Sequence, residues 1–107
     1  LDFTYIDDLV SGVIKIIEHE SAKNEIFNLT YGQSRSISDL SEILKESFPD
    51  IGIKHSARDM LTPMRGTLSI DKAKTLLEYS PQNPLEVGFS KYLDWYRSFV
   101  KDIKEFR

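Results

Sequence analysis

The sequence LDFTYIDDLVSGVIKII, residues 1–17, decides the fold of the first part of the chain. Its apolar side chains recur at helical spacing and form one wide face: Leu9, Val10, Val13, Ile14 and Ile17. Asp7 and Asp8 stand just before this series, where carboxylates cap free N–H groups and meet the positive end of the helix dipole. Capping is favoured over the alternative, a carboxylate pair for acid–base catalysis. Gly12 lowers the helix propensity by about 1 kcal/mol relative to alanine, and it permits close approach of a neighbouring backbone.

Two short segments farther along have patterns typical of strands. Residues 25–30 combine aliphatic and aromatic side chains and end at a turn signal, and residues 51–55 alternate apolar with other residues. Between them, Ser36 and Asp39 have the spacing of a capping box at the start of a helix, which Pro49 ends. The order predicted for this region is therefore strand, helix, strand.

Two more helices are predicted in the last third of the chain. The first is short and covers residues 71–77. The second is long, with Asn83 as N-cap, Pro84 at the first helical position and Glu86 two residues later. Apolar residues hold one face of it for about five turns: Leu85, Phe89, Tyr92, Leu93, Tyr96, Phe99, Val100 and Ile103.

A loop over residues 56–67 has no apolar period, and loops of this length in compact domains are often functional. Arg65 lies in this loop beside Gly66, where an extended backbone can present the guanidinium to an anion. Arginine suits phosphate because its planar fork donates two parallel charge-assisted hydrogen bonds. From spacing alone, a phosphate contact and a solvated loop arginine are equally supported.

The composition excludes several classes of function. The 107 residues amount to one domain, and 14 basic against 17 acidic residues give a net charge of −3, which disfavours nucleic-acid binding. The absence of cysteine removes disulfides, thiolate metal sites and cysteine nucleophiles. We find no apolar run of the ~20 residues that a membrane span needs and no signal-peptide pattern. We therefore expect a cytoplasmic protein without nucleic-acid or membrane partners, and, because Leu1 is not Met, a piece of a longer protein.

The sequence carries no catalytic or metal-binding motif of its own. Its five glycines are scattered, so it contains neither a dinucleotide fingerprint nor a P-loop. His19 and His55 are far apart and lack a ligand pattern, so neither is expected to bind a metal. We expect no catalytic, cofactor-binding or metal-binding residues here, and Arg65 is the single candidate for substrate binding.

Five blocks of sequence are informative when they are taken together. They are DFTYIDDL (2–9), EIFNL (25–29) with Gly32, SISDL (36–40), RGTL (65–68) with DKA (71–73) and LLEYSP (76–81), and LEVGF (85–89) with WY (95–96). In this order they resemble the C-terminal third of extended short-chain dehydrogenase/reductase enzymes, the NAD-dependent nucleotide-sugar epimerases and dehydratases such as UDP-glucose 4-epimerase. Two departures are that Leu1 replaces an arginine of the family and that Met64 stands where some relatives place the arginine that matches Arg65.

The resemblance implies an α/β fold, or α+β for these residues alone, with three to four helices and a few short strands. Residues 1–33 would supply a helix and a strand that complete the parent Rossmann domain, and residues 34–107 would form a small substrate-binding domain. Arg65 would contact the diphosphate of a nucleotide-sugar. In the family, NAD or NADP and the catalytic Tyr-x-x-x-Lys belong to the N-terminal Rossmann domain, and no Tyr-x-x-x-Lys occurs in residues 1–107.

The expected function is therefore that of the substrate-binding C-terminal part of an NAD(P)-dependent nucleotide-sugar epimerase or dehydratase, with a homodimeric parent. Alone, these residues are expected to be inactive, to bind no cofactor and to self-associate through an open sheet edge and an apolar helix face. The alternative is a stand-alone, non-catalytic interaction module of the same architecture. A G-x-x-G-x-x-G motif and a Tyr-x-x-x-Lys motif upstream of residue 1 would favour the enzyme.

Overall fold

The computed structural model describes residues 1–105, with side chains up to residue 102. Its elements are four α-helices and one 3₁₀ turn: α1 (Ile6–Glu18), η1 (Glu20–Ala22), α2 (Ile37–Ser47), α3 (Asp71–Leu77) and α4 (Leu85–Glu105). All four α-helices were predicted from the sequence, and α1 begins three residues before the predicted apolar series. None of the helices in this part of the chain is long and apolar enough to cross a membrane.

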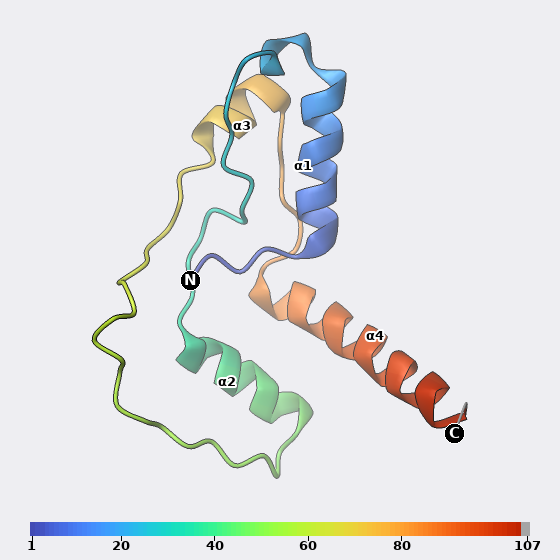
Figure 1. Ribbon diagram of the computed structural model, residues 1–107. Helices are drawn as coiled ribbons and strands as arrows, with labels where there is room; N and C mark the ends of the chain where they lie inside the picture. The colour runs from blue at the N-terminus through green and yellow to red at the C-terminus, as the bar shows by residue number, and fades with distance from the viewer. Residues whose placement is uncertain (106–107) are drawn as a thin grey trace.

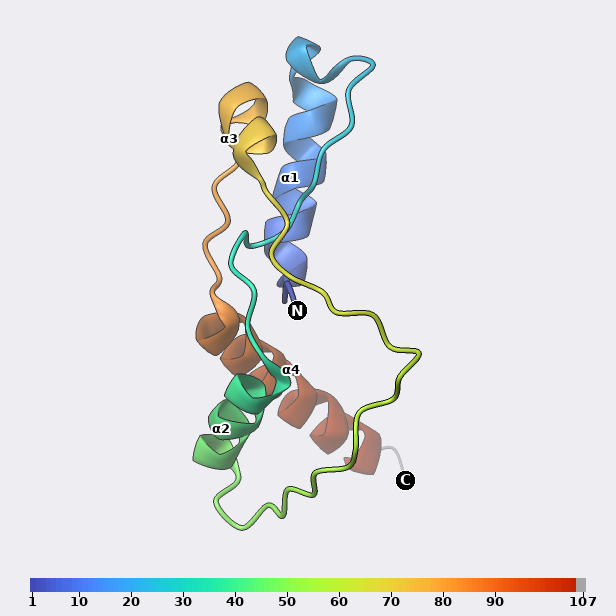
Figure 2. The same cartoon turned by 90° about the vertical axis from the view of Figure 1, so that its left-hand side faces the viewer.

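The helices form two groups. Helices α1 and α3 lie side by side at one end of the molecule, and α2 and α4 lie toward the other end (Figures 1 and 2). The main core lies in the first group and consists of five buried residues, Ala22, Ile70, Ala73, Leu77 and Tyr79. Ile16, Phe27 and Leu29 pack against this core. In the second group, only Leu85 and Leu93 of α4 are buried apolar side chains among the described residues.

Asp8 joins the two groups, and its role differs from the predicted cap. Tyr5 occupies the N-cap position of α1 and makes no side-chain cap hydrogen bond. Asp8, only 4% exposed, instead accepts from Gln82 N at 2.8 Å and from Asn83 N and Nδ2 at 2.9 Å each. A buried carboxylate needs several donors to offset its lost hydration, and the turn before α4 supplies three. The predicted capping by Asp8 is therefore wrong, and the residue ties α1 to the start of α4.

The prediction that Asn83 is the N-cap of α4 is also wrong, because its side chain is used in the contact with Asp8. Helix α4 begins at Leu85, and Gly88 N donates to Pro84 O at 2.9 Å. The side-chain amide of Asn83 donates to Asp8 and accepts from Lys91 Nζ at 2.6 Å, so it does not cap the helix.

The capping box before α2 is confirmed. Asp39 N donates to Ser36 Oγ at 3.0 Å, and Ser36 N donates to Asp39 Oδ2 at 2.8 Å. These two bonds satisfy N–H groups that a helix start leaves free.

The segments predicted as strands do not pair within residues 1–105. Residues 25–30 and 51–55 have no strand assignment, because a strand needs a neighbouring strand to receive its backbone hydrogen bonds and this part of the chain offers none. Side chains hold the first segment instead: Asn28 Nδ2 donates to Ser69 O at 3.3 Å, and Tyr79 OH donates to Thr30 O at 3.0 Å. The described chain is thus mostly helical, as fits an α+β piece whose extended segments lack partners.

The shape is more open than that of a self-contained domain. The radius of gyration is 17.3 Å, and the extents are 49 × 41 × 23 Å. A compact domain of this length has a radius of gyration of about 13 Å. The predicted apolar face of α1 is exposed along its whole length, at Leu9, Val10, Val13, Ile14 and Ile17, and Ile6 at the start of the helix is exposed as well. Four aromatic side chains of α4 are exposed as well: Tyr92, Trp95, Tyr96 and Phe99. The side chain of Ile103, predicted for the same face, lies outside the described residues.

Two glycines allow close packing beside the core. An added Cβ on Gly12 would lie 2.8 Å from both terminal methyl carbons of Leu29, so Gly12 admits this side chain against α1, where a close backbone approach was predicted. Gly32 has φ +83°, a conformation that disfavours residues with a Cβ, and an added Cβ would lie 2.8 Å from Ile70 Cδ1. Gly32 therefore turns the chain directly against the core.

We expect Asp8→Ala to lower the free energy of unfolding by about 2–4 kcal/mol, because it leaves three buried or partly buried donors without an acceptor. Asp7→Ala is the matched control, because Asp7 is exposed in the same turn of α1 and contributes less than about 1 kcal/mol through the helix dipole. Chemical denaturation followed by circular dichroism measures both. Equal losses for the two variants would contradict the role of Asp8.

A second expectation concerns Gly32→Ala, which should lower the free energy of unfolding by about 1–3 kcal/mol because of its positive φ and its contact with Ile70. Gly52→Ala is the control, since an added Cβ there meets nothing within 4 Å, and its effect should stay within about 0.5 kcal/mol. Thermal and chemical unfolding of both variants test this difference.

Candidate functional site

A cavity of about 540 Å³ lies where three distant segments of the chain meet. We call it the Arg65 cavity, and its lining residues are Leu1, Asp2, Phe3, Thr30, Arg65, Gly66, Thr67 and Leu68. It contains the single substrate-binding candidate of the sequence, Arg65, together with two threonine hydroxyls and one carboxylate. The guanidinium of Arg65 forms no hydrogen bond or ion pair with the described residues, and its side chain is exposed. It is therefore available to an anionic ligand.

One residue that lines the cavity, Thr30, is bonded to the core. Its carbonyl oxygen accepts from Tyr79 OH at 3.0 Å, and its hydroxyl accepts from Gly32 N at 3.1 Å. Burial, and secondarily the charge of Asp8, raises the pKa of Tyr79 to about 12. The phenol therefore stays protonated at neutral pH and keeps its proton for the bond to Thr30.

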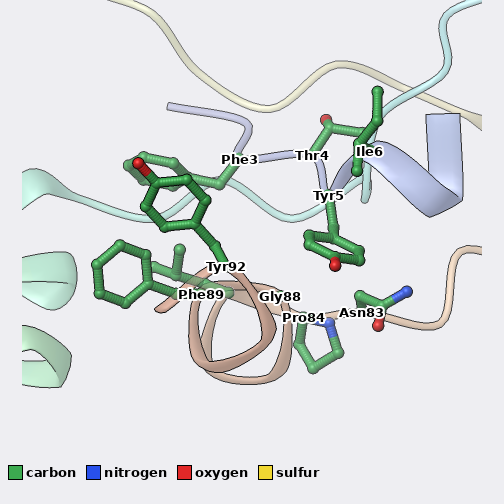
Figure 3. Close-up of a pocket in the computed structure, with 10 residues that line it drawn as sticks. Phe3, Thr4, Tyr5, Ile6, Asn83, Pro84, Gly88, Phe89 and Tyr92 are labelled. Atoms are coloured by element: carbon green, nitrogen blue, oxygen red, sulfur yellow. The ribbon is translucent and has the colours of Figure 1, made fainter. Parts of the chain in front are cut away.

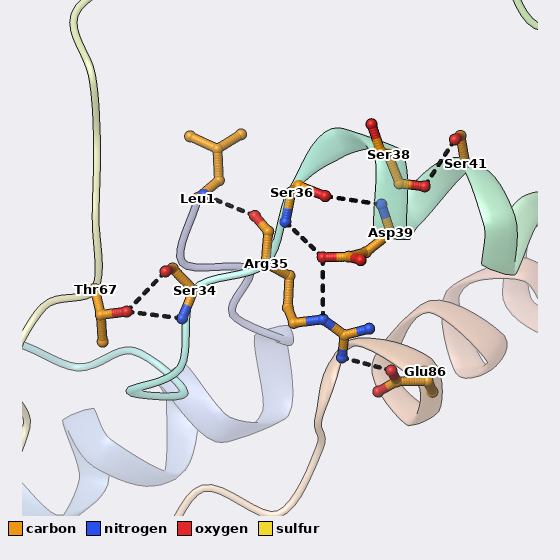
Figure 4. Close-up of polar contacts among 9 residues, drawn as sticks. All are labelled: Leu1, Ser34, Arg35, Ser36, Ser38, Asp39, Ser41, Thr67 and Glu86. Atoms are coloured by element: carbon orange, nitrogen blue, oxygen red, sulfur yellow. Dashed lines mark hydrogen bonds and ion pairs between the residues drawn. The ribbon is translucent and has the colours of Figure 1, made fainter.

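Polar contacts between distant segments hold the part of the cavity lining around residues 1 and 67 (Figure 4). Ser34 N donates to Thr67 Oγ1 at 3.0 Å, and this hydroxyl donates to Ser34 Oγ at 2.7 Å. Leu68 N donates to Asp2 Oδ2 at 2.6 Å. Arg35 N donates to Leu1 O at 2.8 Å, so the segments around residues 1, 35 and 67 lie together. These bonds hold residues 67 and 68, two and three positions after Arg65.

Arg35 connects this part of the lining to α2 and α4. Its guanidinium contacts the carboxylates of Asp39 and Glu86, the first in α2 and the second in α4 (Figure 4). Hydrogen bonds from Ser36, and secondarily the guanidinium, hold the pKa of Asp39 below its usual value. The backbone N–H of Glu86 and then Arg35 lower the pKa of the Glu86 carboxyl. Both acids are therefore charged at neutral pH, and they pair with Arg35, which is not among the residues that line the Arg65 cavity.

A second, smaller cavity of about 260 Å³ is mainly apolar. We call it the aromatic groove, and it is lined by residues 3–6, 83–85, 88, 89 and 92. The rings of Phe3, Phe89 and Tyr92 gather at one end, and Tyr5 and Asn83 lie at the other (Figure 3). The charge of Lys91 lies over the ring of Tyr5, 5.6 Å from its centroid, and its Nζ is bonded to Asn83. The groove offers apolar contact area and no free charged group among its lining residues.

The two histidines lie apart from both cavities. His19 Nδ1 lies 2.8 Å from Lys15 O, and His19 Nε2 lies 4.0 Å from Glu78 Oε2. His55 is exposed in the long connection between α2 and α3.

Sequence reasoning located Arg65 but missed the residues that surround it. Asp2, Thr30 and Thr67 have no periodicity or spacing that marks them, because they come from segments without regular structure. Their proximity depends on contacts between residues more than 30 positions apart. The short blocks that resemble a known family include Asp2 and Thr67 but not Thr30.

Comparison with known proteins gives relatives along nearly the whole chain, although no family model matches it. The chain is 32% identical to a UDP-glucuronate 4-epimerase of Thermodesulfobacterium geofontis, covering 99% of this chain and 33% of that protein. It is 27% identical to UDP-glucuronate 4-epimerase 4 of Arabidopsis thaliana, covering 97% and 27%. It is 33% identical to UDP-glucuronic acid decarboxylase 1 of Xenopus tropicalis, covering 89% and 22%.

The fold has a solved counterpart. The epimerase Mth375 of Methanothermobacter thermautotrophicus matches with a TM-score of 0.84 and 26% identity, over 97% of this chain and 32% of that one. The chain thus spans about a third or less of the length of each of these proteins. In sequence and in fold, residues 1–107 are related to the C-terminal region of nucleotide-sugar epimerases of the extended short-chain dehydrogenase/reductase family, as the sequence motifs predicted.

Proposed function

We propose that residues 1–107 form the substrate-binding C-terminal part of an NAD(P)-dependent nucleotide-sugar epimerase or dehydratase. The observation that carries the proposal is the unpaired guanidinium of Arg65 at a cavity, in a chain whose relatives act on nucleotide-sugars by name. The upstream Rossmann domain of the parent enzyme would hold NAD or NADP and supply the Tyr and Lys of catalysis. When bound there, the nicotinamide takes up and returns a hydride.

The open surfaces support the proposal that another part of the protein covers these residues. The exposed apolar face of α1 is continuous along the helix, and Ile17 at its end is 79% exposed. A soluble protein rarely leaves such a face uncovered. We propose that α1 and the unpaired segment 25–30 complete the Rossmann domain, as part of residues 1–33, while residues 34–107 contribute the substrate-binding part. Without that domain, the same surfaces favour self-association.

The chemistry of the Arg65 cavity suits a diphosphate better than an uncharged ligand. A guanidinium donates two parallel bonds to phosphate oxygens, and Thr30, whose hydroxyl accepts from Gly32 N and can still donate its proton, lines the same cavity. The names of the relatives contain UDP-glucuronate or UDP-glucuronic acid, so we propose a UDP-linked hexuronate as the substrate. The residues described here would bind and orient that substrate, and proton and hydride transfer would take place on residues upstream.

Arg65→Ala should weaken binding of UDP-glucuronate by about 1.5–3 kcal/mol, the range for a hydrogen bond to a charged group. Arg65→Lys should lie between this variant and the natural protein, because lysine keeps the charge but loses the fork. Calorimetric titration of the natural-length protein that contains residues 1–107 measures the dissociation constants.

Arg97→Ala is the matched control for charge. Arg97 lies on α4 beside Asp94 and over the ring of Phe48, outside the residues that line the Arg65 cavity. Its loss should change the binding free energy by less than about 0.5 kcal/mol. If Arg65→Ala left the dissociation constant unchanged, the proposed contact of Arg65 with the diphosphate would be contradicted.

A further inference from the structure

We infer that Asp2 is a positioning residue for Arg65: its carboxylate anchors the end of the Arg65 loop and thereby sets where the guanidinium meets the ligand. The inference rests on the proposed function, because it assigns a task to Asp2 within the same anion site. Asp2 Oδ2 accepts from Leu68 N at 2.6 Å, three residues after Arg65. This bond joins two segments that are 66 positions apart in the sequence.

The anchor matters because the loop before residue 67 makes only local hydrogen bonds among the described residues. Residues 51–70 contain no helix or strand, and the side chains at its tip are almost fully exposed, with Met60 at 98%. The hydrogen bonds recorded within 52–66 are local, as when Arg58 donates to the carbonyl oxygens of Thr62 and Pro63. The first hydrogen bonds from this stretch to another segment are those of Thr67 with Ser34 and of Leu68 with Asp2. The position of Arg65 therefore depends on anchors two and three residues away.

The second carboxylate oxygen of Asp2, Oδ1, indicates that the contact of Asp2 with the Arg65 loop is specific. Oδ1 is fully shielded and has no hydrogen-bond partner in the described part of the chain. Leaving a carboxylate oxygen buried and unpaired is unfavourable, and such atoms in native proteins call for an explanation. The hydrogen bond from Leu68 N to Oδ2 holds the carboxylate in this position.

Asp2 is unsuited to direct contact with the diphosphate of the ligand. A carboxylate repels a diphosphate, and only oxygen acceptors are present on an ionised aspartate. Asp2 therefore assists binding through the backbone of the Arg65 loop. It follows that asparagine, which keeps an oxygen acceptor and removes the negative charge, should serve in its place.

The test is a double-mutant cycle with UDP as the titrant, on the natural-length protein. Asp2→Ala should weaken UDP binding by about tenfold or more, and Asp2→Asn should stay within about twofold of the natural protein. In the Arg65→Ala background, Asp2→Ala should change UDP affinity by less than about twofold, because the group that it positions is gone. A residue that only stabilised the fold would not show this dependence on Arg65.

Asp59→Ala is the matched control. Asp59 Oδ1 accepts from Leu61 N at 2.8 Å, so the variant removes the same kind of carboxylate–amide bond, but one that stays inside the loop. Its UDP affinity should be unchanged. If Asp2→Ala does not fold, Asp2→Leu is the second variant. Leucine keeps a side chain of similar size but has no acceptor, so the same loss of UDP affinity is expected.

The outcomes separate this inference from the proposed function. If Arg65→Ala weakens UDP binding and Asp2→Ala does not, or if the two losses multiply, Asp2 does not position Arg65 and the proposed function stands. If Arg65→Ala leaves UDP binding unchanged, the diphosphate contact and the inference both fall.

Discussion

The architecture depends on the buried carboxylate of Asp8, which α1 carries in its first turn and which accepts three hydrogen bonds from Gln82 and Asn83. These bonds fix the direction in which α4 leaves the core, because the turn that they hold is the last one before the helix. The side-chain amide of Asn83 takes part as well, because its Nδ2 donates to Asp8 and its Oδ1 accepts from Lys91 Nζ. Since few apolar side chains are buried between the two groups of helices, this polar junction does much of what a core does in a compact domain.

The same arrangement explains how an open molecule keeps an ordered cavity. Tyr79 belongs to the core and donates a hydrogen bond to Thr30, which lines the Arg65 cavity. Residues 1–3 line the same cavity and lead toward α1. The cavity is thus connected to the core through Thr30, and to the first turn of α1, which carries Asp8, through residues 1–3. The exposed face of α1 and the exposed aromatic side chains of α4 lie elsewhere, and we propose that the parent enzyme covers them.

Local sequence signals predicted the helices well, and contacts between distant segments decided the rest. The capping box of Ser36 and Asp39 forms as predicted because both partners lie within one helical turn. Asp8 and Asn83 also have the sequence of caps, but each is the other's partner across the chain, and no local pattern contains that information. The strands predicted at 25–30 and 51–55 fail to pair because a strand is defined by its neighbour. The loop context made Arg65 a candidate for anion binding, whereas the hydrogen bond from Leu68 N to Asp2 became visible only in the three-dimensional structure.

The central claim is that these residues supply substrate binding to an enzyme whose cofactor is held upstream. The most direct measurement is a calorimetric titration of NAD into residues 1–107 alone and into the natural-length protein that contains them. The account predicts binding at about micromolar affinity for the natural-length protein and no binding for residues 1–107. Micromolar affinity of residues 1–107 for NAD would contradict it.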